Sequence, residues 1–148
     1  MKTIIKSGML LVAALTAGSA FAFSSSLDFE TTLQPGQTFN YPLERLYENT
    51  VYNMICTFDL DQAGTGDDVS AAQITRRDDM GMAPGDAPEF SVSGQRYGTL
   101  MSGTSITFPI NSRVATEVNH IVKGEEFSVR SLDYTANLIV RCTAYPVQ

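Results

Sequence analysis

The chain contains a single histidine, His120, and two cysteines, Cys56 and Cys142, so few side chains can support nucleophilic catalysis. A serine or cysteine triad needs an imidazole held between a nucleophile and an acid. His120 falls in a predicted strand, where a solitary histidine is ordinarily a structural or surface residue. If the cysteines pair with each other, no thiolate remains as a nucleophile. The sequence therefore disfavours both triad and cysteine catalysis.

Carboxylates are numerous, and a pair of them is what a glycoside hydrolase uses. The aspartates concerned are Asp59, Asp61, Asp67, Asp68, Asp78, Asp79 and Asp86. Acidic residues at loop positions ordinarily form turns and keep the surface solvated. A small β-domain also offers little depth for a substrate cleft. We therefore expect a protein that is not an enzyme and that needs no cofactor.

The segment that starts at Asp59 begins like a calcium-binding loop. Asp59 and Asp61 occupy positions one and three, and a glycine follows at position six. Ala63 at position five and Ser70 at position twelve then lack the oxygen ligand and the bidentate glutamate of an EF-hand. We assign no metal ligands, and a looser calcium site within residues 59–68 stays open.

The first 22 residues have the pattern of a cleavable export signal. Lys2 and Lys6 give a basic start, residues 9–17 are apolar, and a small-x-small site ends at Ala22. The apolar stretch is much shorter than the roughly 20 residues that a membrane span needs. We predict that residues 1–22 are a signal peptide cleaved after Ala22.

The residue after the predicted cleavage is Phe23, not the cysteine that a lipoprotein signal requires. The mature chain, residues 23–148, is therefore expected as one soluble domain, periplasmic or secreted. It carries 8 Lys and Arg against 16 Asp and Glu, a formal net charge of −8. This charge opposes binding to nucleic acid and adsorption to anionic lipid, so we expect no nucleic-acid ligand. The expected partner is another protein, or a cell-envelope or host ligand.

Short runs of alternating apolar and polar residues, separated by Gly, Pro, Asn and Asp, recur along the mature chain and predict an all-β domain. The expected strands are residues 27–33, 38–41, 50–60, 69–76, 89–92, 105–110, 114–121, 125–132 and 138–144. A turn at Lys123 and Gly124 is expected to join residues 114–121 and 125–132 as a hairpin. This spacing favours a single-domain antiparallel β-sandwich, with a small barrel as the alternative.

Both cysteines fall on the inward faces of the most apolar strands. Cys56 shares its face with Met54 and Phe58, and Cys142 shares its face with Val140. In the oxidising compartment that the signal peptide implies, they are expected to form one buried disulfide. Alternation leaves open whether this bond joins facing sheets or neighbouring strands.

Binding residues are expected in loops, where polar and mobile surface is found. The two long loops are residues 61–68 and 77–88, and the second supplies Asp78 and Asp79 as candidates. The turn at residues 93–97 completes the candidate binding surface.

The segment Ser93-Gly94-Gln95-Arg96-Tyr97 resembles the S-G-x-x-Y signature of bacterial periplasmic lysozyme inhibitors, which are small exported β-proteins. The resemblance implies that this loop enters the cleft of a lysozyme. It places the Ser93 hydroxyl near the catalytic carboxylates, beside Gly94, and makes Tyr97 a supporting residue. An acidic inhibitor would also be steered toward a basic lysozyme.

A structural role is a third alternative, because pilus subunits are exported sandwiches that add an apolar N-terminal strand to a neighbour. Leu27, Phe29 and Leu33 have the alternation that such a strand requires. The leading hypothesis is nevertheless an exported, acidic binding protein, with the lysozyme inhibitor and the pilus-like subunit as alternatives.

Overall fold

The computed structural model describes residues 26–62, 70–77, 87–111, 113–133 and 135–147. The predicted signal peptide, residues 1–22, lies outside these ranges. Within them the chain forms ten strands and one short 3-10 helix, Leu43–Arg45, so the all-β prediction is confirmed. The described residues contain no helix that is long and apolar enough to cross a membrane.

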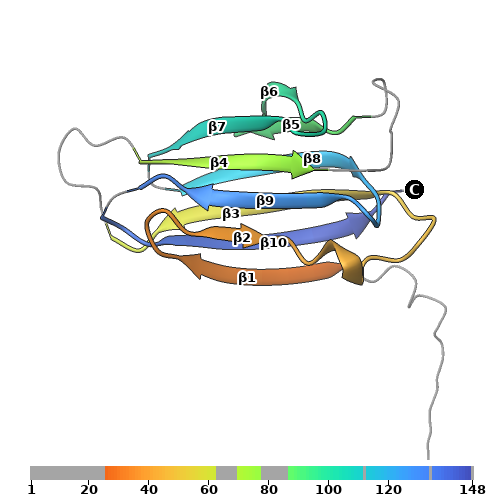
Figure 1. Ribbon diagram of the computed structural model, residues 1–148, viewed down its shortest axis with the longest axis horizontal. Helices are drawn as coiled ribbons and strands as arrows, with labels where there is room; N and C mark the ends of the chain where they lie inside the picture. Colours follow the sequence, from red (N-terminus) through yellow and green to blue (C-terminus); the bar gives the residue numbers. More distant parts are fainter. Residues whose placement is uncertain (1–25, 63–69, 78–86, 112, 134, 148) are drawn as a thin grey trace, which may run out of the picture.

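The strands form two sheets that are antiparallel throughout (Figure 1). The six-stranded sheet has the order β1 (Leu27–Leu33), β10 (Leu138–Pro146), β3 (Tyr52–Leu60), β8 (Arg113–Ile121), β5 (Glu89–Val92) and β6 (Gln95–Thr99). The four-stranded sheet has the order β2 (Thr38–Asn40), β9 (Glu126–Ser131), β4 (Ser70–Arg77) and β7 (Ser105–Ile110). Each strand predicted from alternation is present, with bounds that differ by two residues at most.

Aromatic contacts between the sheets show that they face each other across one core. The rings of Phe58 on β3 and Phe108 on β7 have centroids 5.1 Å apart. At the other side of the core, Phe29 on β1 lies 5.9 Å from Phe39 on β2. These contacts form because alternate side chains of each strand point to the same face. The other face of each sheet is left to solvent.

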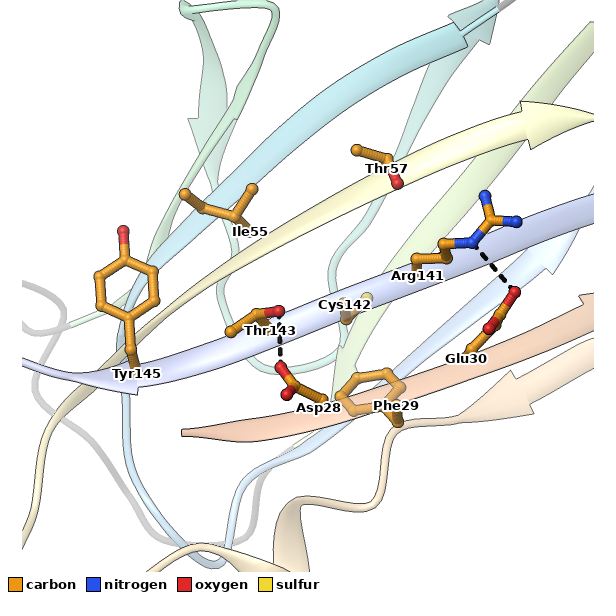
Figure 2. A pocket seen from close by; sticks show the side chains of 9 residues that line it. All are labelled: Asp28, Phe29, Glu30, Ile55, Thr57, Arg141, Cys142, Thr143 and Tyr145. Carbon is orange, nitrogen blue, oxygen red and sulfur yellow. Dashed lines mark hydrogen bonds and ion pairs between the residues drawn. The ribbon is translucent and has the colours of Figure 1, made fainter. Parts of the chain in front are cut away.

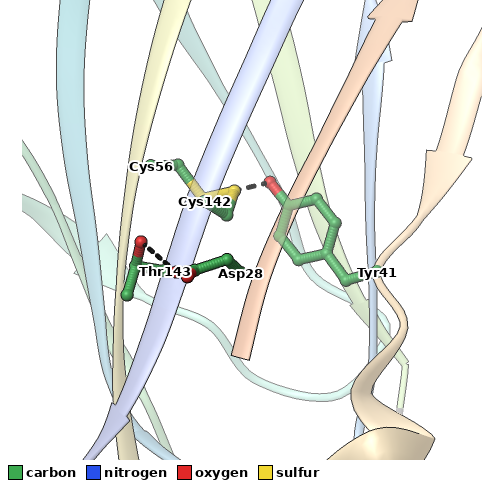
Figure 3. The surroundings of a disulfide bond; sticks show 5 residues. All are labelled: Asp28, Tyr41, Cys56, Cys142 and Thr143. Carbon is green, nitrogen blue, oxygen red and sulfur yellow. Dashed lines mark hydrogen bonds between the residues drawn. A yellow bond between two sulfur atoms is a disulfide. The ribbon is translucent and has the colours of Figure 1, made fainter. Parts of the chain in front are cut away.

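The two cysteines form a disulfide between neighbouring strands, not between facing sheets (Figure 3). Cys56 on β3 and Cys142 on β10 lie directly opposite each other, with their Cα atoms 4.1 Å apart. Both are buried. The hydroxyl of Tyr41 points at Cys56 Sγ, 3.9 Å away, and burial raises the pKa of this tyrosine. The bond therefore joins strands 86 positions apart in the sequence.

The prediction that Lys123 and Gly124 join two strands as a hairpin is wrong. The turn is present, with Gly124 at a φ of 103° and the Glu125 N–H donating to the Val122 carbonyl at 3.3 Å. However, β8 belongs to the six-stranded sheet and β9 to the four-stranded sheet, so the turn crosses the core. Glu125 is buried in this connection and forms an ion pair with Arg76 of β4 at 3.3 Å. Turn residues specify a change of direction but not the pairing partner of the next strand.

Strand β6 was not predicted from the sequence, because its residues show no apolar alternation. All of its side chains are exposed or half-buried. It exists because β5 pairs with it, with a register shift between Phe90 and Ser91. Tertiary pairing thus supplies the strand conformation that the local sequence does not indicate.

Asp133 anchors the connection between β9 and β10. Its Oδ1 accepts the backbone N–H groups of Thr135 and Ala136 at 2.7 and 2.8 Å, and Oδ2 accepts the hydroxyl of Ser70. Burial of the carboxyl acts to raise its pKa, but the hydrogen bonds from Ser70, Ala136 and Thr135 outweigh it and lower the pKa. The ionised carboxylate therefore contributes to stability.

Removal of the disulfide should destabilise the protein substantially. The Cys56→Ala/Cys142→Ala double variant is expected to lose about 2–5 kcal/mol of unfolding free energy, because the bond closes a long loop in the unfolded chain. Urea unfolding, followed by tyrosine fluorescence, measures the difference. A reductant without denaturant should leave the native bond intact, since both sulfurs are buried. A loss below about 1 kcal/mol would contradict this account.

Stability should fall at acid pH as Asp133 is protonated. Because its folded pKa is lowered, its contribution is complete above the ordinary pKa of 3.8 and is lost as pH falls through the folded value. Asp133→Asn should cost about 1–3 kcal/mol at pH 7. Urea unfolding at a series of pH values should show the difference from the unsubstituted protein shrinking below about pH 4. A difference that is independent of pH would refute the assignment.

Candidate functional site

The predicted binding residues Ser93 and Gly94 form the tip of the hairpin between β5 and β6. Both have positive φ, 52° and 81°, as the two central residues of a type I′ turn require. Both side-chain positions are exposed. The backbone N–H of Ser93 donates to the carbonyl of Ala115 on β8 at 2.8 Å, which ties the tip to the sheet.

Tyr97 lies on the same hairpin and is half-exposed, at 42%. Its ring meets Phe90 edge-on, with the centroids 6.4 Å apart. Arg96 beside it forms an ion pair with Glu89 at 3.1 Å. The hairpin therefore brings the three motif residues Ser93, Gly94 and Tyr97 onto one exposed element.

The acidic candidates are only partly placed. Asp78 and Asp79 lie outside the described residues, as do Asp67 and Asp68. Asp61 accepts hydrogen bonds from the backbone and the side chain of Asn137, both at 3.0 Å. In the part of the chain that the structure describes, no three His, Cys, Asp or Glu residues form a group that could hold a metal ion.

The histidine marks an irregularity at the end of β8. His120 has a φ of 65°, and β8 shifts register against β3 at this point. Its backbone N–H donates to the side-chain oxygen of Asn53 at 3.3 Å, while the side-chain oxygen of Asn119 accepts the N–H of Glu89 at 3.2 Å. The observed contacts of this segment hold the bulge in place.

A shallow hollow lies on the solvent face of the six-stranded sheet, over β1, β10 and β3 (Figure 2). Its volume is about 730 Å³. We call it the outer-face site; its outward lining residues are Asp28 and Glu30 of β1, Ile55 and Thr57 of β3, and Arg141, Thr143 and Tyr145 of β10. Phe29 of β1 and Cys142 of β10, which belong to the inward face, complete its lining.

A row of alternating charges borders the outer-face site and crosses four neighbouring strands. Arg113 of β8 contacts Asp59 of β3 at 3.4 Å, and the same carboxylate oxygen contacts Arg141 of β10 at 3.3 Å. Arg141 also forms an ion pair with Glu30 of β1 at 3.0 Å. Exposed pairs of this kind add little stability, typically below 1 kcal/mol each. The charge row therefore contributes little to the stability of the fold.

Apolar groups lie beside the charge row. Ile55 is 40% exposed at an outward position of β3, directly opposite Thr143. Tyr145 is half-buried two positions further along β10. Thr143 donates a hydrogen bond to Asp28 at 2.7 Å and so fixes the edge of the hollow. The site thus combines a small apolar surface with hydroxyl and charged groups.

The sequence contains a signal for the outer-face site, but the signal lies in strands and not in the loops where binding residues were expected. Ile55 and Tyr145 occupy positions of β3 and β10 where alternation calls for polar residues. Such a break indicates either a second packed face or a contact surface. It does not indicate that the two residues lie on neighbouring strands, because that depends on the β3–β10 pairing.

Comparison with known proteins does not identify a family or a function for the chain. No family model matches the chain, and no curated protein matches it. The function must therefore be inferred from the site itself.

Proposed function

We propose that the mature chain is an exported, acidic binding domain that engages another protein through the outer-face site. The observation that carries this proposal is the position of exposed Ile55 and half-buried Tyr145 beside the charge row. Protein interfaces combine an apolar centre that includes aromatic residues with a polar rim. The outer-face site has both parts on one sheet.

The shape of the site favours a macromolecule over a small ligand. Small-molecule sites enclose most of the ligand surface in a concave pocket. The outer-face site is instead an open hollow on a sheet, lined mostly by outward side chains of three strands (Figure 2). A partner surface can cover such a hollow, whereas a small molecule would remain largely solvated.

Export is supported by two independent observations. The first is the signal-like pattern that ends at Ala22. The second is the disulfide, because such bonds persist in oxidising compartments. We propose a periplasmic or secreted location and a β-sandwich built from the two facing sheets.

Substitution within the outer-face site should abolish partner capture. The tagged mature protein, which should begin at Phe23 by intact mass, is used to capture proteins from its own organism. Ile55→Ser/Tyr145→Ser should reduce the yield of the retained partner at least about tenfold, as expected for central interface residues. The matched control, Gln73→Ala/Thr107→Ser, alters the solvent face of the other sheet. Equal loss or equal retention with both double variants would refute the outer-face site.

A second candidate function is lysozyme inhibition, favoured by one observation. Ser93, Gly94 and Tyr97 are all exposed on one hairpin. An exposed hairpin tip has the form needed to enter an enzyme cleft. The Ser93 hydroxyl would then donate to a catalytic carboxylate.

If this candidate is correct, the mature protein inhibits a lysozyme and Ser93→Ala weakens the inhibition. The expected loss is about 10- to 100-fold in the inhibition constant, because a hydrogen bond to a charged group is removed. Turbidity of a cell-wall suspension measures the activity of the lysozyme. Ser91→Ala, on the same hairpin but outside the motif, serves as the control. Unchanged inhibition by Ser93→Ala would remove the motif from consideration.

A further inference from the structure

The four strands at the sheet edges differ in how easily another strand can pair with them. β2 has only three residues, β7 contains Pro109, and the pairing of β6 with β5 is interrupted by a register shift. Short strands, prolines and bulges are features that block edge pairing. β1 has none of them: its seven residues pair with β10 in unbroken register. In the described part of the chain, no strand pairs with its other side.

The register identifies which backbone groups of β1 face away from the sheet. Cys56 and Cys142, with Cα atoms 4.1 Å apart, have the spacing of a non-hydrogen-bonded pair. The N–H and C=O of Cys142 therefore point to Phe29, the residue opposite it on β1. Since these directions alternate along a strand, the N–H and C=O groups of Asp28, Glu30 and Thr32 point outward from the edge.

The charge row indicates which side chains a strand added at this edge should carry. It alternates in sign over β8, β3, β10 and β1 and ends on the acidic Glu30. A cation opposite Glu30 would continue the alternation onto an added strand. Asp28, also exposed on this face, offers a second acidic position two residues away.

A second copy of the chain is a poor occupant of this edge. In an antiparallel pairing centred on Glu30, the two Glu30 side chains would lie directly opposite each other. Like charges at opposed positions destabilise a strand pair. A register that places Glu30 opposite Asp28 of the second copy would be equally unfavourable. A register centred on Thr31 places Thr32 opposite Glu30, which avoids the repulsion but supplies no cation to continue the charge row.

On the core-facing side of the same edge, an added strand would need apolar residues. Phe29 of β1 and Phe39 of β2 are only partly buried, although they pack against the core. With Tyr41 they form a group of three rings whose centroids lie 5.2–5.9 Å apart. Apolar side chains on an added strand would lie beside Phe29 and extend this group.

We propose that β1 accepts an antiparallel β-strand from a partner protein, in which lysine or arginine alternates with apolar residues. The cations would face Asp28 and Glu30 on the solvent side, and the apolar residues would lie beside Phe29 on the inner side. Backbone hydrogen bonds to Asp28, Glu30 and Thr32 supply affinity, as in other cases of strand addition. The inference deepens the proposed binding function, on which it rests, by naming the class of partner.

A designed peptide of alternating lysine and valine tests the inference on the mature protein. Binding should protect the amides of Asp28, Glu30 and Thr32 from hydrogen exchange measured by NMR. N-methylation of the lysines should abolish this protection, because in an antiparallel pair the residues opposite Glu30 make the hydrogen bonds. N-methylation of the valines, whose N–H groups point away from β1, is the matched control and should preserve it.

The charge requirement has its own test. Glu30→Lys should weaken binding of the lysine peptide roughly three- to tenfold, and a glutamate–valine peptide should then bind better than it does to the unsubstituted protein. Thermal unfolding checks that this variant remains folded. Equal binding of both peptides to both proteins would overturn the charge complementarity.

The outcomes separate this inference from the proposed function. Ile55→Ser/Tyr145→Ser should leave the protection of the β1 amides intact. Absence of protection at millimolar peptide, or equal effects of the two N-methylated peptides, overturns strand addition without affecting partner capture. Conversely, partner capture that is unchanged by the Ile55 and Tyr145 substitutions would refute the outer-face site. Protection of the β1 amides would still show whether a strand adds to this edge.

Discussion

The pairing of β3 with β10 is the constraint on which the rest of the structure depends. It aligns nine residues from the first half of the mature chain with nine near its end, and the disulfide fixes the register in the middle. β1 then pairs with the other side of β10, and β8 pairs with the other side of β3. The outer-face site and the charge row exist only because these four strands are neighbours.

The same strands serve stability on one face and recognition on the other. On β3, Met54 and Phe58 are buried in the core, whereas Ile55 is exposed to solvent. This division follows from the two-residue period of a strand, which sends successive side chains to opposite faces. Substitutions at outward positions can therefore alter binding with little effect on the core, since surface changes usually shift stability by less than 0.5 kcal/mol.

Local sequence patterns predicted most of the strands because the apolar residues in them alternate. They failed at residues 95–99, where β6 has no buried side chain and forms only through its pairing with β5. They also failed at Lys123 and Gly124, because the same turn chemistry serves a hairpin and a crossing between sheets. The hollow lies on the outward face of a sheet, and no local pattern indicates that the three strands beneath it are neighbours.

The sequence by itself determined the positions of every strand except β6, the inward orientation of Cys56 and Cys142, and the acidic charge of the chain. These properties depend on composition and on a period of two, both of which are local. Only the tertiary structure decided that the cysteines join neighbouring strands, and that Arg113, Asp59, Arg141 and Glu30 form one row. Strand order depends on contacts between residues far apart in the chain, and no local period encodes which strands become neighbours.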